Sequence, residues 1–105
     1  MDLTVYIDVA IDWESVDFAW DEAKRRLNLA KHKLDLVVGV SLFDGRPTIS
    51  HPSARNGEDR WVTIGRIEGL MLALIWTERE GVIRLISLRR ARDAERRAFD
   101  ARVCH

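Results

Sequence analysis

Residues 70–90 read LMLALIWTEREGVIRLISLRR, and they concentrate the apolar side chains of the chain together with its most conspicuous cations. Two runs rich in β-branched and aromatic residues flank Glu80-Gly81, a short break in which glycine lets the backbone reach positive φ and reverse. Each run is apolar on both faces, which is typical of strands that are covered on both sides. We therefore predict a hairpin that lies centrally in a sheet.

The residues before this hairpin change their periodicity twice. Residues 3–11 alternate between apolar and polar side chains, which predicts a half-buried strand at the edge of the sheet. Residues 18–31 show helical spacing, and the carboxylates at 21–22 stand at the expected N-terminus, where they suit the free N–H groups. A short second helix is expected over residues 36–42, with Asp35 as its cap.

The remaining segments predict an α+β fold. Residues 60–67 show a strand pattern, and the turn at Glu68-Gly69 makes this strand the first of three in an antiparallel meander. Residues 48–50 allow a further short strand, and a final helix starts at Asp93. The predicted fold is an antiparallel β-sheet meander with two N-terminal helices and one C-terminal helix.

Length and composition are those of a small soluble protein. The 105 residues fit a single domain, and 47% hydrophobic with 32% charged residues is ordinary for a globular chain. No apolar run is long enough to span a bilayer and no signal peptide is recognisable, so we expect a cytoplasmic protein with no membrane contact. Cys104 is the only cysteine, which leaves no internal disulfide.

Positive charge is concentrated towards the C-terminus, although the formal net charge is zero. Seven arginines and three acids lie between residues 84 and 102, whereas acids predominate between residues 2 and 22. If both turns are two-residue loops, cross-strand pairing brings arginines to both ends of one sheet face. One end then carries Arg60, Thr77 and Arg84, and the other carries Arg66, Met71 and Arg90. Between them lies an apolar centre of Val62, Ile64, Ala73, Ile75, Ile86 and Leu88.

Arginine is the most informative residue type for function. Its planar donors suit bidentate contacts with phosphate, although a salt-bridged protein surface explains the same residues equally well. The expected sheet and last helix cluster Arg60, Arg66, Arg79, Arg84, Arg89, Arg90, Arg96 and Arg97. The histidines show no metal-ligand spacing and no glycine-rich phosphate loop follows a strand, so we expect neither a metal nor a cofactor.

Several motifs resemble, in order and spacing, those of the BrnT toxins of bacterial type II toxin–antitoxin systems. They are FAWDEAK at 18–24, Asn28, Lys31-His32, GEDR at 57–60, IGR at 64–66, TEREG at 77–81, IRLIS at 83–87, RRA at 89–91 and ERR at 95–97. The chain departs from the family in three ways. Residues 1–17 form an N-terminal extension, Lys33 stands where a glycine is common, and Phe99 stands where a tyrosine is frequent.

The resemblance implies a small RelE-like fold and a metal-independent endoribonuclease that cleaves RNA and inhibits translation. It also implies a BrnA-type antitoxin that neutralises the toxin and binds operator DNA. We expect a heterotetramer of two toxins and two antitoxins. An exposed apolar centre with an arginine rim would suit a helical antitoxin segment laid over the sheet.

Metal-free RNA cleavage needs a base for the 2′-OH proton, cations for the charge on the phosphate, and a donor for the leaving 5′-oxygen. Glu78 or His32 is the candidate base, and Lys31 or His32 is the candidate donor. A salt bridge to a neighbouring arginine is the structural alternative for Glu78. The expected catalytic set is His32, Glu78, Arg79, Arg84 and Arg90. The expected RNA-binding set is Lys24, Lys31, Arg60, Arg66 and Arg89.

A different class of function fits the same residues. A non-catalytic adaptor would use its basic groove only to bind a partner protein or DNA, and the zero net charge favours this alternative slightly. Inducing the chain alone and following growth and RNA integrity distinguishes the two classes.

Overall fold

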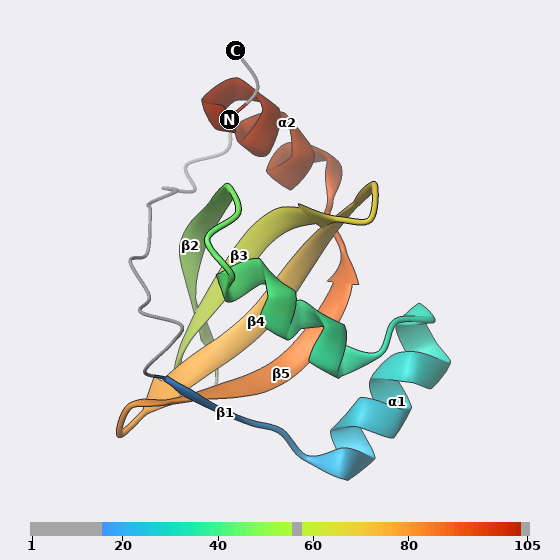
Figure 1. Cartoon of the computed structure of the whole chain (residues 1–105), viewed down its shortest axis with the longest axis vertical. Helices are drawn as coiled ribbons and strands as arrows, with labels where there is room; N and C mark the ends of the chain where they lie inside the picture. Colours follow the sequence, from blue (N-terminus) through green and yellow to red (C-terminus); the bar gives the residue numbers. More distant parts are fainter. Residues whose placement is uncertain (1–15, 56–57, 104–105) are drawn as a thin grey trace.

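The computed structural model describes residues 16–55 and 58–103, which form a five-stranded sheet with helical segments packed on it (Figure 1). The elements are β1 (Asp17–Ala19), α1 (Glu22–His32), the 3-10 helix η1 (Leu36–Phe43), β2 (Thr48–Arg55), β3 (Glu58–Ile67), β4 (Leu70–Arg79), β5 (Val82–Arg90) and α2 (Asp93–Val103). The strand order is β1-β5-β4-β3-β2; β1 runs parallel to β5, and the other neighbouring pairs are antiparallel. The strand predicted over residues 3–11 lies outside the described residues.

The predicted hairpin is confirmed, because β4 is the middle strand and pairs with β5 across Glu80-Gly81. Both turn residues have positive φ, 53° for Glu80 and 79° for Gly81, as a type I′ turn requires. The predicted turn at Glu68-Gly69 has the same form, with φ values of 49° and 81°. These two turns connect the three strands of the predicted antiparallel meander, and the predicted α+β class is confirmed. The likeness to the RelE fold stays a prediction.

The predicted N-terminal helices are confirmed in position and only in part in type. Asp21 caps α1 by accepting from the Ala23 N–H at 2.7 Å, and Asp35 caps η1. The second helix is a 3-10 helix rather than an α-helix, and half of its eight residues are valine or glycine, which are weak helix formers. At Gly39 it lies directly on the sheet, because a Cβ there would meet Leu74 Cδ1 at 2.7 Å. The sequence does not predict β1: residues 18 and 19 lie in the stretch assigned helical spacing, but they belong to this strand, and three residues are too few to show a period.

A β-bulge in β5 alters the predicted register. Ile75 pairs with Ser87, but the next residue, Trp76, pairs with Leu85, so Ile86 is an extra residue in the strand. Because successive side chains point to opposite faces, one extra residue reverses the faces of every residue after it.

The side chains after the bulge therefore depart from the prediction. Arg90 no longer pairs with Met71, and Leu88 lies in the core on the opposite face. The predicted face of Leu88 and the predicted pairing of Arg90 are wrong, because turn geometry does not reveal a bulge inside a strand. Arg66, Met71 and Arg90 nevertheless line one pocket at this end of the sheet, as predicted. Before the bulge, the predicted alignment of Thr77 with Arg84 is confirmed.

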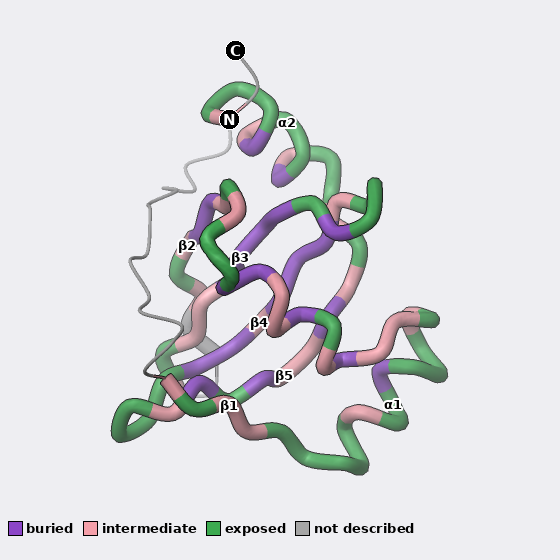
Figure 2. The backbone as a smooth tube through the Cα atoms, viewed as in Figure 1, coloured by how far each residue is buried: buried purple, intermediate pink, exposed green. Residues whose placement is uncertain are grey.

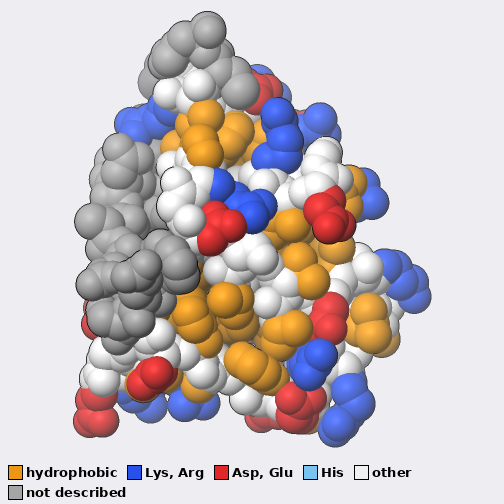
Figure 3. Space-filling model, viewed as in Figure 1, with side chains coloured by type: hydrophobic (Ala, Val, Ile, Leu, Met, Phe, Trp, Pro, Cys, Tyr) orange, Lys and Arg blue, Asp and Glu red, His pale blue; other side chains and the backbone are white. Residues whose placement is uncertain are grey.

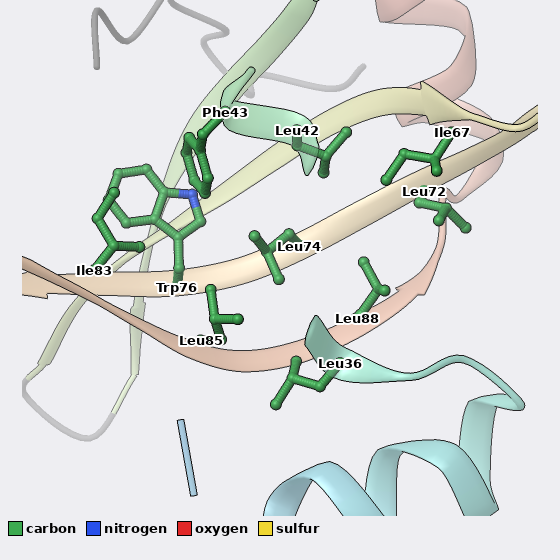
Figure 4. Packing of buried hydrophobic residues seen from close by; sticks show 10 residues of the cluster. All are labelled: Leu36, Leu42, Phe43, Ile67, Leu72, Leu74, Trp76, Ile83, Leu85 and Leu88. Carbon is green, nitrogen blue, oxygen red and sulfur yellow. The ribbon is translucent and has the colours of Figure 1, made fainter. Parts of the chain in front are cut away.

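The larger core lies on the sheet face that η1 covers, with Leu36, Leu42 and Phe43 packed on β4 and β5 (Figure 4). Trp76 is 1% exposed, meets the Phe43 ring edge-on at 5.3 Å between centroids, and donates Nε1–H to Thr63 Oγ1 at 2.8 Å. Buried segments run along the middle of β3, β4 and β5 (Figure 2). Hydrophobic side chains also gather on the surface of this face (Figure 3).

The opposite face is covered at one end by α2. Phe99 is 3% exposed and packs in a cluster with Ile49, Val62, Ile64 and Ala73. The expectation of an exposed apolar centre is therefore wrong for Val62, Ile64 and Ala73, which pack with Phe99 of the last helix, whereas Ile75 and Ile86 are half-buried.

An ion pair fixes α2 to the sheet. The Glu95 carboxylate accepts two hydrogen bonds from Arg89, at 2.7 and 2.9 Å, and one from the Arg92 N–H at 2.8 Å, and His51 Nε2 lies 3.3 Å away. Burial raises the pKa of Glu95, but these hydrogen bonds outweigh it and hold the pKa well below its usual value. Breaking a buried pair of this kind costs about 3–5 kcal/mol. Arg89 is therefore a structural residue of the α2 junction.

Candidate functional site

Asn28 joins α1 to β5. Its side chain is 5% exposed, and Nδ2 donates to the carbonyl oxygens of Leu34 and Leu88, each at 2.9 Å. Oδ1 accepts from the Leu88 N–H at 2.9 Å and from Ser87 Oγ at 3.2 Å. Asn28 thus pairs with both backbone groups of Leu88 as a neighbouring strand would. The helical spacing that sets Asn28 between Lys24 and Lys31 does not reveal this buried role.

A groove lies between α1 and β5 beside this junction. It has a volume of about 360 Å³, and we call it the helix–strand groove. Its lining residues are Lys24, Leu27, Asn28, Lys31, His32, Ile86 and Ser87. Two lysines therefore stand at a largely apolar groove that also contains an imidazole.

His32 is the titratable group of this groove. Burial lowers the pKa of its imidazole, and the positive charges of Lys31 and Arg89 lower it further. The ring is therefore neutral near neutral pH, which leaves one nitrogen free to accept a proton.

A second pocket of about 240 Å³ adjoins the groove, and we call it the cationic pocket. Three cations and two carboxylates stand among its lining residues, which are Trp20, Asp21, Lys24, Glu58, Thr77, Arg79, Arg84, Leu85 and Ile86. Within the described part of the chain, Arg84 is exposed and forms no ion pair, so its guanidinium is available to a ligand. Arg79 lies 3.8 Å from a Glu58 oxygen, a contact weakened by the 69% exposure of the arginine side chain.

The two cavities meet at the bulge of β5. Lys24 and the bulge residue Ile86 line both of them. Bulges are over-represented next to active sites because they redirect side chains. The cationic pocket and the helix–strand groove therefore form one continuous surface that carries Lys24, Lys31, His32, Arg79 and Arg84.

Three other predicted site residues lie away from this surface. Arg66 and Arg90 line a third pocket of about 390 Å³ at the opposite end of β5, together with Arg96 and Asp100. Glu78 follows Thr77 on β4, so its exposed side chain points to the opposite face of the sheet from Arg79 and Arg84.

The two remaining predicted arginines have acidic partners. Arg89 is paired with Glu95, and its side chain is 15% exposed. Arg60 Nε donates to Glu58 at 3.0 Å, and Glu58 also contacts Arg79. Arg60 is therefore an indirect neighbour of the cationic pocket, whereas Arg89 belongs to the fold.

Several residues that line the continuous surface are absent from the predicted catalytic and RNA-binding sets, among them Trp20, Leu27, Ile86 and Ser87. Ile86 and Ser87 sit in an apolar strand whose bulge has no signature in the sequence. Leu27 has the spacing of a core residue, yet it is 68% exposed. Trp20 is 37% exposed and donates Nε1–H to Glu22 at 2.8 Å. An aromatic residue directly before a helix cap is the one available signal for its position.

Two further features are absent from the described residues. No group of three or more His, Cys, Asp or Glu side chains in 16–55 and 58–103 is arranged to hold a metal ion. No helix in the same ranges is long and apolar enough to cross a membrane.

Comparison with known proteins supplies the family. The family model that matches is described as the ribonuclease toxin BrnT of type II toxin–antitoxin systems, and it matches residues 20–95, well over half of the chain. No curated protein matches the chain significantly. The matched range contains Asn28, both lysines of the groove, and Arg79 and Arg84. The resemblance predicted from the sequence motifs is confirmed, and the chain belongs to the BrnT family of ribonuclease toxins.

Proposed function

We propose that this protein is a toxin that cleaves RNA where the cationic pocket meets the helix–strand groove, without a metal ion. Cleavage of cytoplasmic RNA would inhibit translation. The family supports ribonuclease activity, and the continuous surface supports the position of the reaction.

One observation gives the proposal its main support. Lys24 and Ile86 line both cavities, so a phosphate bound by Lys24 and Arg84 would have the neutral imidazole of His32 on the same surface. Anion-binding cations beside a group able to accept a proton are the combination that metal-free RNA cleavage needs.

The proposed reaction is an in-line transfer within the RNA. His32 accepts the proton of the 2′-OH, the 2′-oxygen forms a bond to phosphorus, and the bond from phosphorus to the 5′-oxygen breaks. Arg84, Arg79 and Lys24 stabilise the charge that develops on the phosphate oxygens. The Lys31 ammonium donates a proton to the leaving 5′-oxygen. The products are a 2′,3′-cyclic phosphate and a 5′-hydroxyl.

We assign the base to His32 rather than Glu78 because their surroundings differ. His32 lines the groove, and its lowered pKa keeps the ring neutral. Glu78 points to the other face of the sheet from Arg84. Arg90 and Arg66 line the third pocket, where they would hold a distant part of a longer RNA.

A type II toxin has an antitoxin partner, and we propose that a BrnA-type antitoxin, which also binds operator DNA, covers the cationic pocket. Phe99 of α2 covers Val62, Ile64 and Ala73 of the apolar centre, so the contact would depend mainly on Arg84, Arg79 and Lys24. An acidic antitoxin segment matches this charge. Dimerisation of the antitoxin would complete a heterotetramer of two toxins and two antitoxins.

Cleavage should persist in excess EDTA and should leave 2′,3′-cyclic phosphate ends, because protein cations and the imidazole supply every required role. Mass spectrometry of a cleaved oligoribonucleotide reads the ends directly. Activity that disappears in EDTA and returns with magnesium would contradict the proposal. Intact RNA and normal growth after induction of the chain alone would favour the non-catalytic adaptor.

Arg84→Ala should slow cleavage of a short oligoribonucleotide by about 10²–10³-fold, the usual cost of losing one charge-stabilising donor. Arg90→Ala should leave cleavage of the short substrate nearly unchanged and weaken the binding of longer RNA, because Arg90 lies in the third pocket. The matched control is Arg102→Ala, an exposed arginine on α2. Equal losses for Arg84→Ala and Arg102→Ala would show that the cationic pocket is not the site.

Excess non-cleavable RNA should displace the antitoxin, because both would bind the cationic pocket. Arg84→Ala should weaken antitoxin binding more than Arg90→Ala, because Arg84 lines the cationic pocket and Arg90 lines the third pocket. Calorimetric titration of each variant with the antitoxin, with and without RNA, measures both effects. A stable ternary complex would mean that neutralisation acts from another surface.

A further inference from the structure

The helix–strand groove has a feature that the chemistry at the phosphate does not use. Leu27 is 68% exposed on α1 and lines the groove opposite Ile86 of β5. The fold gains little from an apolar side chain left mostly in solvent. Together with the His32 ring, these side chains give the groove apolar walls, and Lys24 and Lys31 stand beside them.

We propose that the helix–strand groove binds one nucleobase of the RNA, next to the phosphate held in the cationic pocket. The inference rests on the proposed function, because it takes RNA as the ligand. The base-binding subsite is formed by Leu27, Ile86 and the face of the His32 ring, which leaves the in-plane nitrogen of His32 for the 2′-OH proton.

Continuity between the cavities favours a nucleotide as the occupant. In RNA each phosphate is joined through one sugar to a base, so a base lies within one nucleotide of a bound phosphate and can reach an adjoining cavity. Lys24 and Ile86 line both cavities, which places the groove directly beside the cationic pocket. The volume of about 360 Å³ falls in the range of small-molecule sites, roughly 300–1,000 Å³.

The side chains of the groove suit stacking rather than reading of the base edge. Imidazole rings and apolar side chains are common partners for unstacked RNA bases. Asn28, whose amide is the natural reader of a base edge, gives both hydrogens to Leu34 and Leu88 and uses Oδ1 for Leu88 and Ser87. The subsite should therefore require a base and tolerate a purine or a pyrimidine, because every base offers a flat face.

The requirement for the cations of the adjoining pocket distinguishes a nucleotide from a protein segment as the occupant of the groove. An apolar side chain of a protein partner would also fit the walls, but it has no reason to need the adjoining cationic pocket. A nucleotide uses both cavities at once, through its base and its phosphate. Binding that depends on the base and on the phosphate cations together is therefore the property to measure.

The test uses fluorescence anisotropy with a 2′-O-methyl oligoribonucleotide, which cannot be cleaved, and copies in which one base at a time is removed. Loss of the base in the groove should weaken wild-type binding by about 5- to 150-fold, the usual range for one stacked base. Leu27→Ala should weaken binding of the intact oligonucleotide but not of the copy without that base. Leu29→Ala is the matched control, because Leu29 is 52% exposed on the same helix and does not line the groove.

The outcomes separate this inference from the proposed function. Equal effects of Leu27→Ala and Leu29→Ala, or no position at which base removal matters, would overturn the base subsite even if the chain cleaves RNA. A Leu27→Ala defect confined to antitoxin binding would assign the groove to the protein partner instead. Base-dependent binding without any cleavage of ordinary RNA would support the subsite and contradict the nuclease. No binding of the intact oligonucleotide by the wild type would overturn both.

Discussion

The two-sided hydrogen bonding of Asn28 to the backbone of Leu88 joins α1 to β5, and the proposed functional surface depends on this junction. Without it, α1 would meet β5 through exposed leucines and long charged side chains only. Because Nδ2 and Oδ1 satisfy buried backbone groups, any displacement of the helix would leave those groups unpaired, at about 1–3 kcal/mol each. The helix is therefore held in one position, and with it Lys24, Lys31 and His32.

The bulge at Ile86 completes the surface from the strand side. The turn at Glu80-Gly81 aligns Arg84 with Thr77, and the bulge that follows turns Leu88 into the core, so the same strand contributes to the proposed ligand site and to a packed interior within five residues. A regular strand would place Leu88 on the face of α2 and Arg89 in the core. The ion pair of Arg89 with Glu95, which holds α2, thus depends on the same irregularity.

The sequence predicts the meander well because its signals are local. Both turns need positive φ, and glycine at 69 and 81 marks them, while Asp21 and Asp35 mark the helix starts. The bulge and β1 leave no such signal, because the bulge is a single extra residue in β5 and β1 is only three residues long. The proposed site is predictable only in part for the same reason. The sequence shows which residues are arginines, but only the strand register shows that Arg84 and Arg90 line different pockets.

We propose that Asn28 positions Lys24, Lys31 and His32 for cleavage as well as stabilising the fold, and the cleavage rate of Asn28→Ala tests this role. The rate should be measured at a temperature at which hydrogen exchange shows the amides of β4 still protected. We expect kcat/KM to fall by about a hundredfold, as for other displacements of roughly 1 Å near reacting groups. A folded Asn28→Ala variant that cleaves RNA at the wild-type rate would contradict the account.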